Sequence, residues 1–160
     1  MATAVEPMRG TKLSVDFVIP GEPKGKGRAR SRIARSRDGR QFVTHYTPKN
    51  TVEYENLVRM AAHEAMCGEA PTIHPCRVRI AAFCSIPSSW SKKKQARALA
   101  GDVLPTGKPD LDNTEKTVLD GMNKIVYRDD SVVCDVVKSK RYSLTPRVEV
   151  SVRELDGEPA

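Results

Sequence analysis

The stretch KPDLDNTEK (residues 108–116) decides where the central helix of the chain begins, and YRDD (residues 127–130) follows it closely. Asp110 and Asp112 are two residues apart, so their side chains point to the same side in an extended segment. The apolar residues that follow recur at the three- and four-residue spacing of a helix: Val118, Leu119, Met122 and Ile125. The sequence therefore predicts two aspartates at the mouth of a helix, with Lys116 one turn inside it.

These charged residues have a functional and a structural interpretation. Carboxylates gathered at one place suit Mg2+, which prefers oxygen ligands and keeps several waters. However, Asp112 with Glu115 also resembles a capping box, and Asp112, Lys116 and Asp120 are spaced as an i,i+4 ion-pair ladder. Asp129-Asp130 could likewise be turn residues before a strand. Spacing alone leaves both interpretations open.

The chain of 160 residues fits a single domain with its own core, and its net charge of +7 is concentrated in one segment. Residues 21–40 hold eight basic residues against two acidic ones. The basic residues are Lys24, Lys26, Arg28, Arg30, Arg32, Arg35, Arg37 and Arg40. Such a segment indicates a polyanionic partner, most simply nucleic acid, although a solvated arm is the alternative.

Several other classes of site and location are disfavoured by the sequence. The four cysteines show no CxxC spacing and the three histidines complete no zinc pattern, so we expect reduced thiols in a cytoplasmic protein. No signal peptide or apolar run of membrane length is present, which predicts no membrane partner. The segment at residues 21–27 resembles a phosphate-binding loop, but it is one residue short and Gly27 replaces the Ser or Thr that would bind magnesium. We therefore expect a flexible basic loop there.

The rest of the pattern predicts one α/β domain of the α+β type, a mixed β-sheet with a basic β-hairpin and two to three helices packed on it. Residues 1–12 are expected to be a flexible leader, residues 13–153 the domain, and residues 154–160 a flexible tail. The expected elements are a strand at 13–19, a hairpin at 28–46, a helix from 48 to 67, a strand at 78–86, a short helix after Ser88 or Ser89, the central helix, and strands at 132–142 and 148–152.

Two further segments are candidates for contact with nucleic acid. Asp38-Gly39 predicts a two-residue hairpin turn; in the hairpin, Arg28, Arg30 and Arg32 share one face, and Phe42 and Tyr46 add aromatic rings, so the ribbon could lie along a phosphate backbone. In the short helix, Lys92 and Lys93 are either a second phosphate contact or a solvated face. Trp90 either anchors that helix to the core or stacks on an unpaired base.

With these residues in view, the sequence resembles the RusA family of Holliday-junction resolvases, which are endodeoxyribonucleases. The resemblance covers most of residues 13–153 and is carried by an ordered set of motifs. They are Pro-Gly-Glu-Pro after the first strand, Thr51 with Tyr54, Ile86-Pro87 at a strand end, KPDLDN at 108–113, Lys116, LDGMN at 119–123 and YRDD at 127–130. Such a set is far more specific than paired carboxylates alone.

The resemblance implies Asp110, Asp112 and Asp130 as metal-binding residues with Asp129 beside them, and Lys116 as a catalytic lysine. It implies an Mg2+ cofactor, for which Mn2+ could substitute, and a homodimer. Thr114 departs from the family pattern, where an apolar residue is more usual, and this should affect packing rather than ligands. With the charge pattern, the expected DNA-binding residues are Lys24, Lys26, Arg28, Arg30, Arg32, Lys92, Lys93 and Lys108.

The predicted function is therefore Mg2+-dependent, structure-specific endonuclease cleavage that resolves Holliday junctions by paired symmetric hydrolysis in DNA recombination and repair. The expected partner is a four-way junction or other branched DNA, at the bacterial nucleoid or in a phage-infected cell. Two alternatives stay open at this stage. One is a nuclease for flaps or forks, and the other is a junction-DNA-binding protein without catalytic activity.

Overall fold

The computed structural model describes residues 11–160, so most of the predicted leader lies outside the described residues. The elements in chain order are β1 (Ser14–Pro20), β2 (Arg30–Arg35), β3 (Gln41–Tyr46), α1 (Lys49–Met66), β4 (Cys76–Ser85), α2 (Lys92–Leu99), α3 (Leu111–Met122), η1 (Asp130–Val132), β5 (Val133–Ser143) and β6 (Arg147–Glu154). This is an α+β domain with a mixed sheet and three α-helices, as predicted. The domain boundaries themselves stay a prediction.

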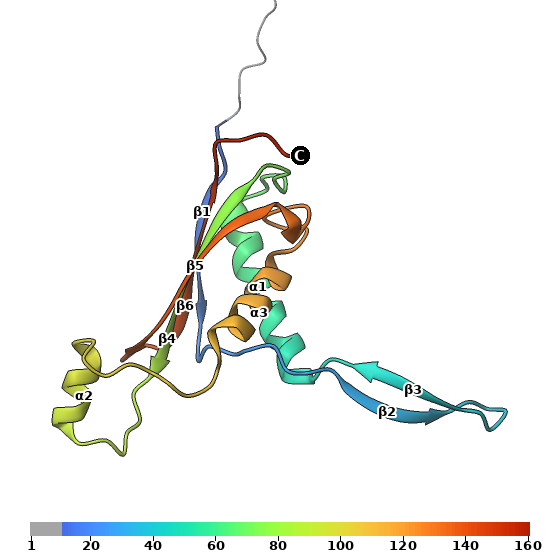
Figure 1. The fold of residues 1–160 in the computed structure, drawn as a ribbon, viewed down its shortest axis with the longest axis horizontal. Coiled ribbons are helices and arrows are strands. Elements are labelled where there is room, and N and C mark those ends of the chain that lie inside the picture. The colour runs from blue at the N-terminus through green and yellow to red at the C-terminus, as the bar shows by residue number, and fades with distance from the viewer. Residues whose placement is uncertain (1–10) are drawn as a thin grey trace, which may run out of the picture.

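Four strands form the main sheet in the order β1-β6-β4-β5. The β1–β6 and β6–β4 pairs are antiparallel, whereas β4 and β5 are parallel. Parallel neighbours need a long crossover, and the chain between β4 and β5 supplies it with α2 and α3. Figure 1 shows α1 and α3 together along one side of this sheet. Alternate residues of β1, β4 and β6 are buried beneath them.

Helices α1 and α3 meet each other closely within the core. In α1 the buried residues recur every fourth position, at Tyr54, Val58, Ala62 and Met66. Gly121 of α3 faces Val58, and a Cβ atom placed on Gly121 would lie 2.6 Å from the Cβ and from the Cγ1 of Val58. The two helix backbones can therefore approach only because position 121 has no side chain.

Strands β2 and β3 form a separate two-stranded hairpin that projects away from the body of the molecule (Figure 1); we call residues 30–46 the arm. The hairpin was predicted, but the expected two-residue turn is wrong. The Gly39 amide donates to the Ser36 carbonyl at 3.0 Å, and the Ser36 amide donates to the Arg40 carbonyl at 2.8 Å. Gly39 has a φ of 84°, so the connection is a three-residue loop with a left-handed glycine at its end.

Helix α2 is anchored to the end of β5 by Trp90. The Trp90 ring meets the Tyr142 ring edge to face, with 5.3 Å between their centroids, and the Lys94 ammonium lies 3.7 Å from the centroid of Trp90. Of the two interpretations of Trp90, the structural anchor is the one that the packing supports. The expected cap at Ser88 or Ser89 is wrong, because the Ser91 hydroxyl accepts from the Lys94 amide at the helix start.

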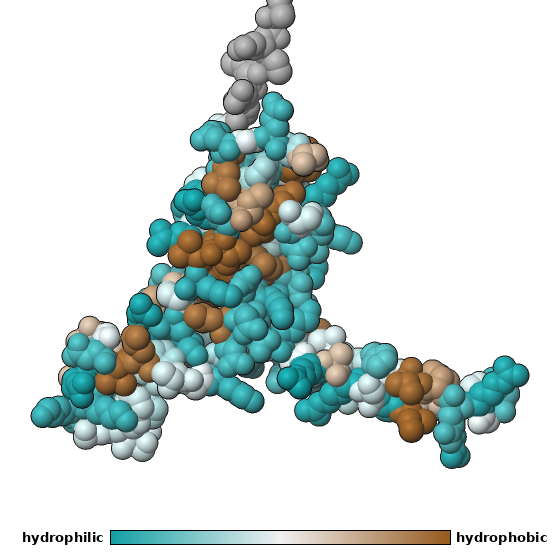
Figure 2. Space-filling view, in the orientation of Figure 1, coloured by the Kyte–Doolittle hydropathy of each residue, from teal (hydrophilic) through white to brown (hydrophobic). Residues whose placement is uncertain are grey.

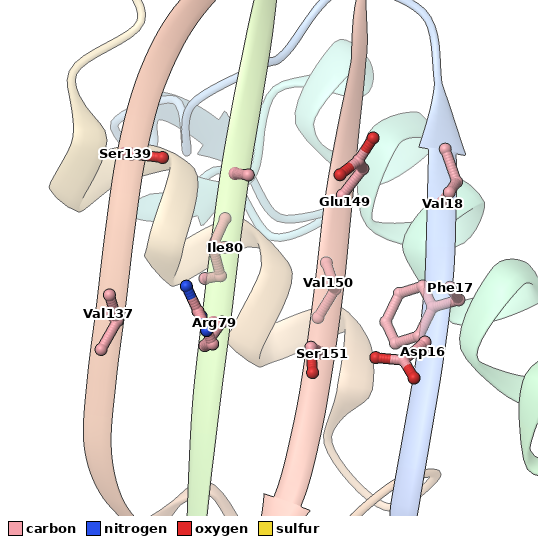
Figure 3. Close-up of a pocket in the computed structure, with 11 residues that line it drawn as sticks. Asp16, Phe17, Val18, Arg79, Ile80, Val137, Ser139, Glu149, Val150 and Ser151 are labelled. Carbon is pink, nitrogen blue, oxygen red and sulfur yellow. The ribbon is translucent and has the colours of Figure 1, made fainter.

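The face of the sheet turned away from α1 and α3 is open, and Figure 3 views it with helices behind the strands. We call this surface the open face; it holds a shallow hollow of about 450 Å³. Val18 and Val137 there are each 50% exposed. Among the described residues, no helix is long and apolar enough to span a membrane.

Candidate active site

The start of α3 is fixed by backbone hydrogen bonds to Asp110. The Asp110 carbonyl accepts from the Thr114 amide at 3.0 Å and from the Thr114 hydroxyl at 3.1 Å. Thr114 is buried, so this hydroxyl satisfies its hydrogen-bonding capacity inside the helix. The threonine therefore does more than pack, because it also holds the backbone that carries the Asp110 side chain.

The loop before α3 is held from the neighbouring strand. Lys140 of β5 donates from its ammonium to the Gly107 carbonyl at 2.5 Å and to the Pro109 carbonyl at 2.9 Å. Two residues earlier on the same face of β5, Lys138 forms an ion pair with Glu115 of α3. Strand β5 thus positions both the loop that leads to Asp110 and the first turns of the helix.

The basic loop at residues 24–27 lies against the same helix start. The Lys26 amide donates to the Asn113 carbonyl at 3.0 Å, and the Gly27 amide donates to the Thr51 hydroxyl of α1 at 3.0 Å. A Cβ atom on Gly25 would lie 2.9 Å from the Cβ of Asn113. The glycines let this backbone pass close to α3, so the loop is tied down in place of the flexible loop that the sequence predicted.

The charged residues around α3 are paired differently from the ladder that the spacing suggested. Lys26 forms ion pairs with Asp120 and, at 3.8 Å, with Glu55 of α1, and the hydrogen bond that its ammonium donates to Asp120 is the main reason that the pKa of Lys26 is raised. Glu115 pairs with Lys138, so it completes no capping box. Both structural interpretations of the α3 start are therefore wrong.

Asp112 and Lys116 are left without a structural role by this arrangement. Both are exposed, and neither makes an ion pair or a side-chain hydrogen bond within residues 11–160. The Asp110 carboxylate has one contact in that part of the chain, from the Asn113 side-chain amide at 3.5 Å. Two carboxylates and a lysine with so few contacts among the described residues are available for a ligand.

Tyr127 links the second acidic segment to α3. This tyrosine is fully buried, and its hydroxyl donates to the Leu119 carbonyl at 2.7 Å. Its pKa is raised, first by burial and then by the negative charges of Asp130, Asp120 and Asp129. Asp130 begins η1, and hydrogen bonding to Ser131 is the main cause of the lowered pKa of Asp129. Asp129 and Asp130 therefore do begin a helical turn before β5, as the structural interpretation predicted. Their charges also act on the Tyr127 phenol, which is hydrogen-bonded to α3.

A groove of about 810 Å³ brings the basic loop, α1 and the start of α3 together. Its lining residues are Lys24, Gly25, Lys26, Gly27, Arg28, Asn50, Thr51, Lys108, Pro109, Asp110 and Asn113. Five predicted site residues thus share one groove, although the Lys26 ammonium is already paired. The other predicted DNA-binding residues lie outside this groove: Arg30 and Arg32 are on the arm, and Lys92 and Lys93 are on α2. Figure 1 shows the arm and α2 on opposite sides of the start of α3.

The donor set suits a hard divalent cation, but the predicted ligands are not gathered as a closed group. Within the described part of the chain, no three His, Cys, Asp or Glu side chains are placed so that they could hold a metal ion together. Mg2+ is commonly held by only one or two carboxylates, with waters and substrate phosphates completing its shell. The carboxylates at Asp110 and Asp112 match that chemistry, and the metal-binding roles of Asp110, Asp112, Asp129 and Asp130 stay predictions.

Sequence reasoning missed the positioning roles of three residues, although it had named two of them, Thr51 and Thr114, for other reasons. Thr51, Thr114 and Lys140 hold the three backbone segments that line the groove. One signal was present for the lysines, because Lys138 and Lys140 are two apart in a strand and must share a face. The partners of those lysines depend on tertiary packing, which no spacing reveals.

Two comparisons with known proteins show what this chain is similar to. A family model described as endodeoxyribonuclease RusA matches residues 20–153, which include every predicted site residue. The chain is also 36% identical over 143 residues to the uncharacterized protein YqaN of Bacillus subtilis (strain 168). That alignment covers 88% of this chain and 96% of YqaN.

Proposed function

The chain belongs to the RusA endodeoxyribonuclease family, and from this premise we propose that it resolves Holliday junctions by Mg2+-dependent, paired and symmetric hydrolysis of phosphodiester bonds. The observation that supports this most directly is the exposed Asp112 and Lys116, which make no ion pair or side-chain hydrogen bond within residues 11–160, on the helix whose start lines a groove rich in cations. We propose branched DNA at the nucleoid, or phage DNA in an infected cell, as the substrate in recombination and repair.

In this proposal Asp110, Asp112 and Asp130 hold Mg2+, with Asp129 beside them, and Mn2+ can substitute. The bound cation would supply an activated water and offset charge that develops on phosphorus. The negative charges of these aspartates repel the phosphates of DNA, which gives the site a need for a divalent cation. Lys24, Arg28 and Lys108 then bind phosphates along the groove, which orients the scissile strand over the carboxylates.

Lys116 is expected to act on the transition state rather than on binding. It lies one turn into α3 from Asp112, and its ammonium has no ion-pair partner in residues 11–160, so it can stabilise negative charge on the phosphate or orient the attacking water. We expect Lys116→Met to lower the single-turnover cleavage rate by about 100-fold while the junction Kd changes by less than about threefold. Equal losses in rate and in binding would show that Lys116 only attracts DNA.

We also propose that two copies pair through the open face of the sheet. A four-way junction requires two symmetric cuts, and a two-fold dimer presents two identical sites. On this face three arginines already form ion pairs with carboxylates of the same strand or of the neighbouring strand: Arg153 with Asp16, Arg147 with Glu149, and Arg77 with Asp135. The open face also carries exposed valines at positions 18 and 137, on its two edge strands, and Arg79, which forms no ion pair in residues 11–160. Four strands of this length offer on the order of 600 Å², close to the ~800 Å² per partner of a stable interface.

The dimer surface is tested by a charge placed on β5, an edge strand of the open face. We expect Val137→Asp to weaken dimerisation by at least about 100-fold, because a charged side chain would replace an apolar one between the two sheets. Leu57→Asp on α1, where the leucine is 42% exposed, is the matched control and should leave the dimer intact. Sedimentation equilibrium without DNA measures both variants, and a Val137→Asp protein that dimerises like the wild type would place the interface elsewhere.

The function itself is tested with a synthetic four-way junction incubated with Mg2+, with Mn2+ or with EDTA. Paired symmetric nicks that depend on the metal would support a resolvase. Equal or faster cleavage of flaps and forks would instead favour a broader branched-DNA nuclease. Tight junction binding without any cleavage would favour a binding protein, and the carboxylates at α3 would then need another explanation.

A further inference from the structure

The arm presents two faces of different chemistry. The cross-strand register pairs Arg30 with Tyr46, Arg32 with Thr44, and Ala34 with Phe42. Because side chains alternate along a strand, these six residues lie on one side of the ribbon, which we call the aromatic face. The opposite side, the aliphatic face, carries Ser31, Ile33, Arg35, Gln41, Val43 and His45.

The aromatic face is exposed and cationic. Phe42 is 49% exposed and Tyr46 is 47% exposed, since a two-stranded ribbon has no second layer to cover them. Arg30 and Arg32 make no ion pair within residues 11–160, unlike Arg77, Arg147 and Arg153 of the open face. Figure 2 shows apolar side chains gathered on the projecting arm among hydrophilic ones. Aromatic rings interleaved with unpaired arginines match a nucleic acid, which offers both bases and phosphates.

The aromatic face is also continuous with the candidate active site. The groove that contains Asp110 is lined at its other side by Arg28 and Asn50. A second hollow, at the base of the arm, is lined by Asn50 again together with Arg30 and Tyr46. A strand of DNA that lies over the carboxylates can therefore continue onto this face without leaving the surface.

We propose that the aromatic face binds the branch point of the DNA substrate, with Phe42 and Tyr46 stacking on bases that are unstacked there while Arg30 and Arg32 contact the flanking phosphates. The two rings are four residues apart, about 13 Å along a strand, so each can meet a different base. Bases in a linear duplex are paired and stacked and present no free ring face, whereas a branch point does. The arm thereby distinguishes branched DNA from linear DNA. This inference rests on the proposed function, because it assumes a branched DNA substrate.

The experiment measures binding in EDTA, where cleavage is blocked, to a four-way junction and to a linear duplex of equal length. A 2-aminopurine placed at the branch reports stacking by a change in its fluorescence. We expect Phe42→Leu and Tyr46→Leu to weaken junction binding by about 5- to 100-fold, the range found when a ring that stacks on a base is removed. Duplex binding should change by less than twofold, and Phe42→Trp should retain both the affinity and the fluorescence change.

Controls on the aliphatic face separate stacking from the integrity of the arm. Ile33→Ala and Val43→Ala remove apolar side chains that are 68% and 59% exposed on the other side of the same hairpin, and they should leave junction binding unchanged. Replacing Arg30 and Arg32 together should weaken junction and duplex alike and reduce the salt slope by about two.

The inference is overturned if Phe42→Leu weakens junction and duplex equally, has no effect, or is matched by Ile33→Ala. It is also overturned if Phe42→Leu dissociates the dimer, since the arm would then contact a second copy. Failure of the proposed function looks different, because the wild-type protein would then leave the junction uncut in Mg2+. If an arm variant cleaves normally with metal and still prefers the junction to the duplex, only the proposed role of the arm is refuted, and the proposed function stands.

Discussion

We expect Asp112→Asn to lower the rate of junction cleavage by at least about 10³-fold, which corresponds to about 4 kcal/mol of transition-state stabilisation. Asparagine keeps the shape of the side chain but removes the charge that would hold a divalent cation. Asp112 is exposed in the first turn of α3 and makes no ion pair in residues 11–160, so no contact in the fold is lost. The loss of its interaction with the helix dipole should lower the free energy of unfolding by only about 0.3–1 kcal/mol.

Binding should move in the opposite direction from cleavage. In EDTA the Asp112 carboxylate repels the phosphates, so the Asn variant should bind the junction as tightly as the wild type or more tightly. Asp102→Asn is the matched control, because it removes the same charge from the exposed loop that follows α2. The control should cleave at the wild-type rate. Cleavage by Asp112→Asn within about tenfold of the wild-type rate would remove Asp112 from the metal site.

The sheet and the helices could be predicted because their residues follow simple periods. In β1, Val15, Phe17 and Ile19 alternate with polar residues, and the structure buries all three. The parallel pairing of β4 and β5 could not be predicted in the same way, because periodicity does not say which strands become neighbours. The turn of the arm was missed because Asp38-Gly39 fits a two-residue turn as well as the longer loop, and only the Ser36 hydrogen bonds decide between them.

The candidate site was found through its motifs, whereas the roles of its neighbours required the fold. A pattern of charges cannot show that Lys26 is paired with Asp120, which lies 94 residues away, while Lys116 has no ion-pair partner in residues 11–160. Lys26 was therefore counted with the DNA-binding cations, although its ammonium joins the loop to α1 and α3. The sequence likewise could not show that Gly25 and Gly121 lie at close contacts, because this depends on which part of the chain packs next to them.

The largest effect on folding is expected from Gly121→Ala. The new methyl carbon would lie 2.6 Å from two carbons of Val58 and 3.2 Å from the Glu55 carbonyl oxygen. Val58 is fully buried and the carbonyl belongs to the α1 backbone, so neither can yield without moving the helix. We expect a loss of about 3 kcal/mol or more in the free energy of unfolding, at the upper end of the cost of overpacking a core. For a chain of this length that corresponds to a fall in Tm of about 6–12 °C.

Gly107→Ala is the control that separates this clash from a general cost of losing a glycine. A Cβ atom on Gly107 meets nothing within 4 Å, and its φ is not in the left-handed region. Thermal and urea unfolding should therefore leave Gly107→Ala near the wild type or slightly stabilised. If both variants lost stability equally, the approach of α1 to α3 would not depend on position 121. If only Gly121→Ala lost stability, and Val58→Ala restored part of the loss, the contact between positions 121 and 58 would be shown to set α3 against α1. That contact would then also determine where α3 places Asp110 and Lys116.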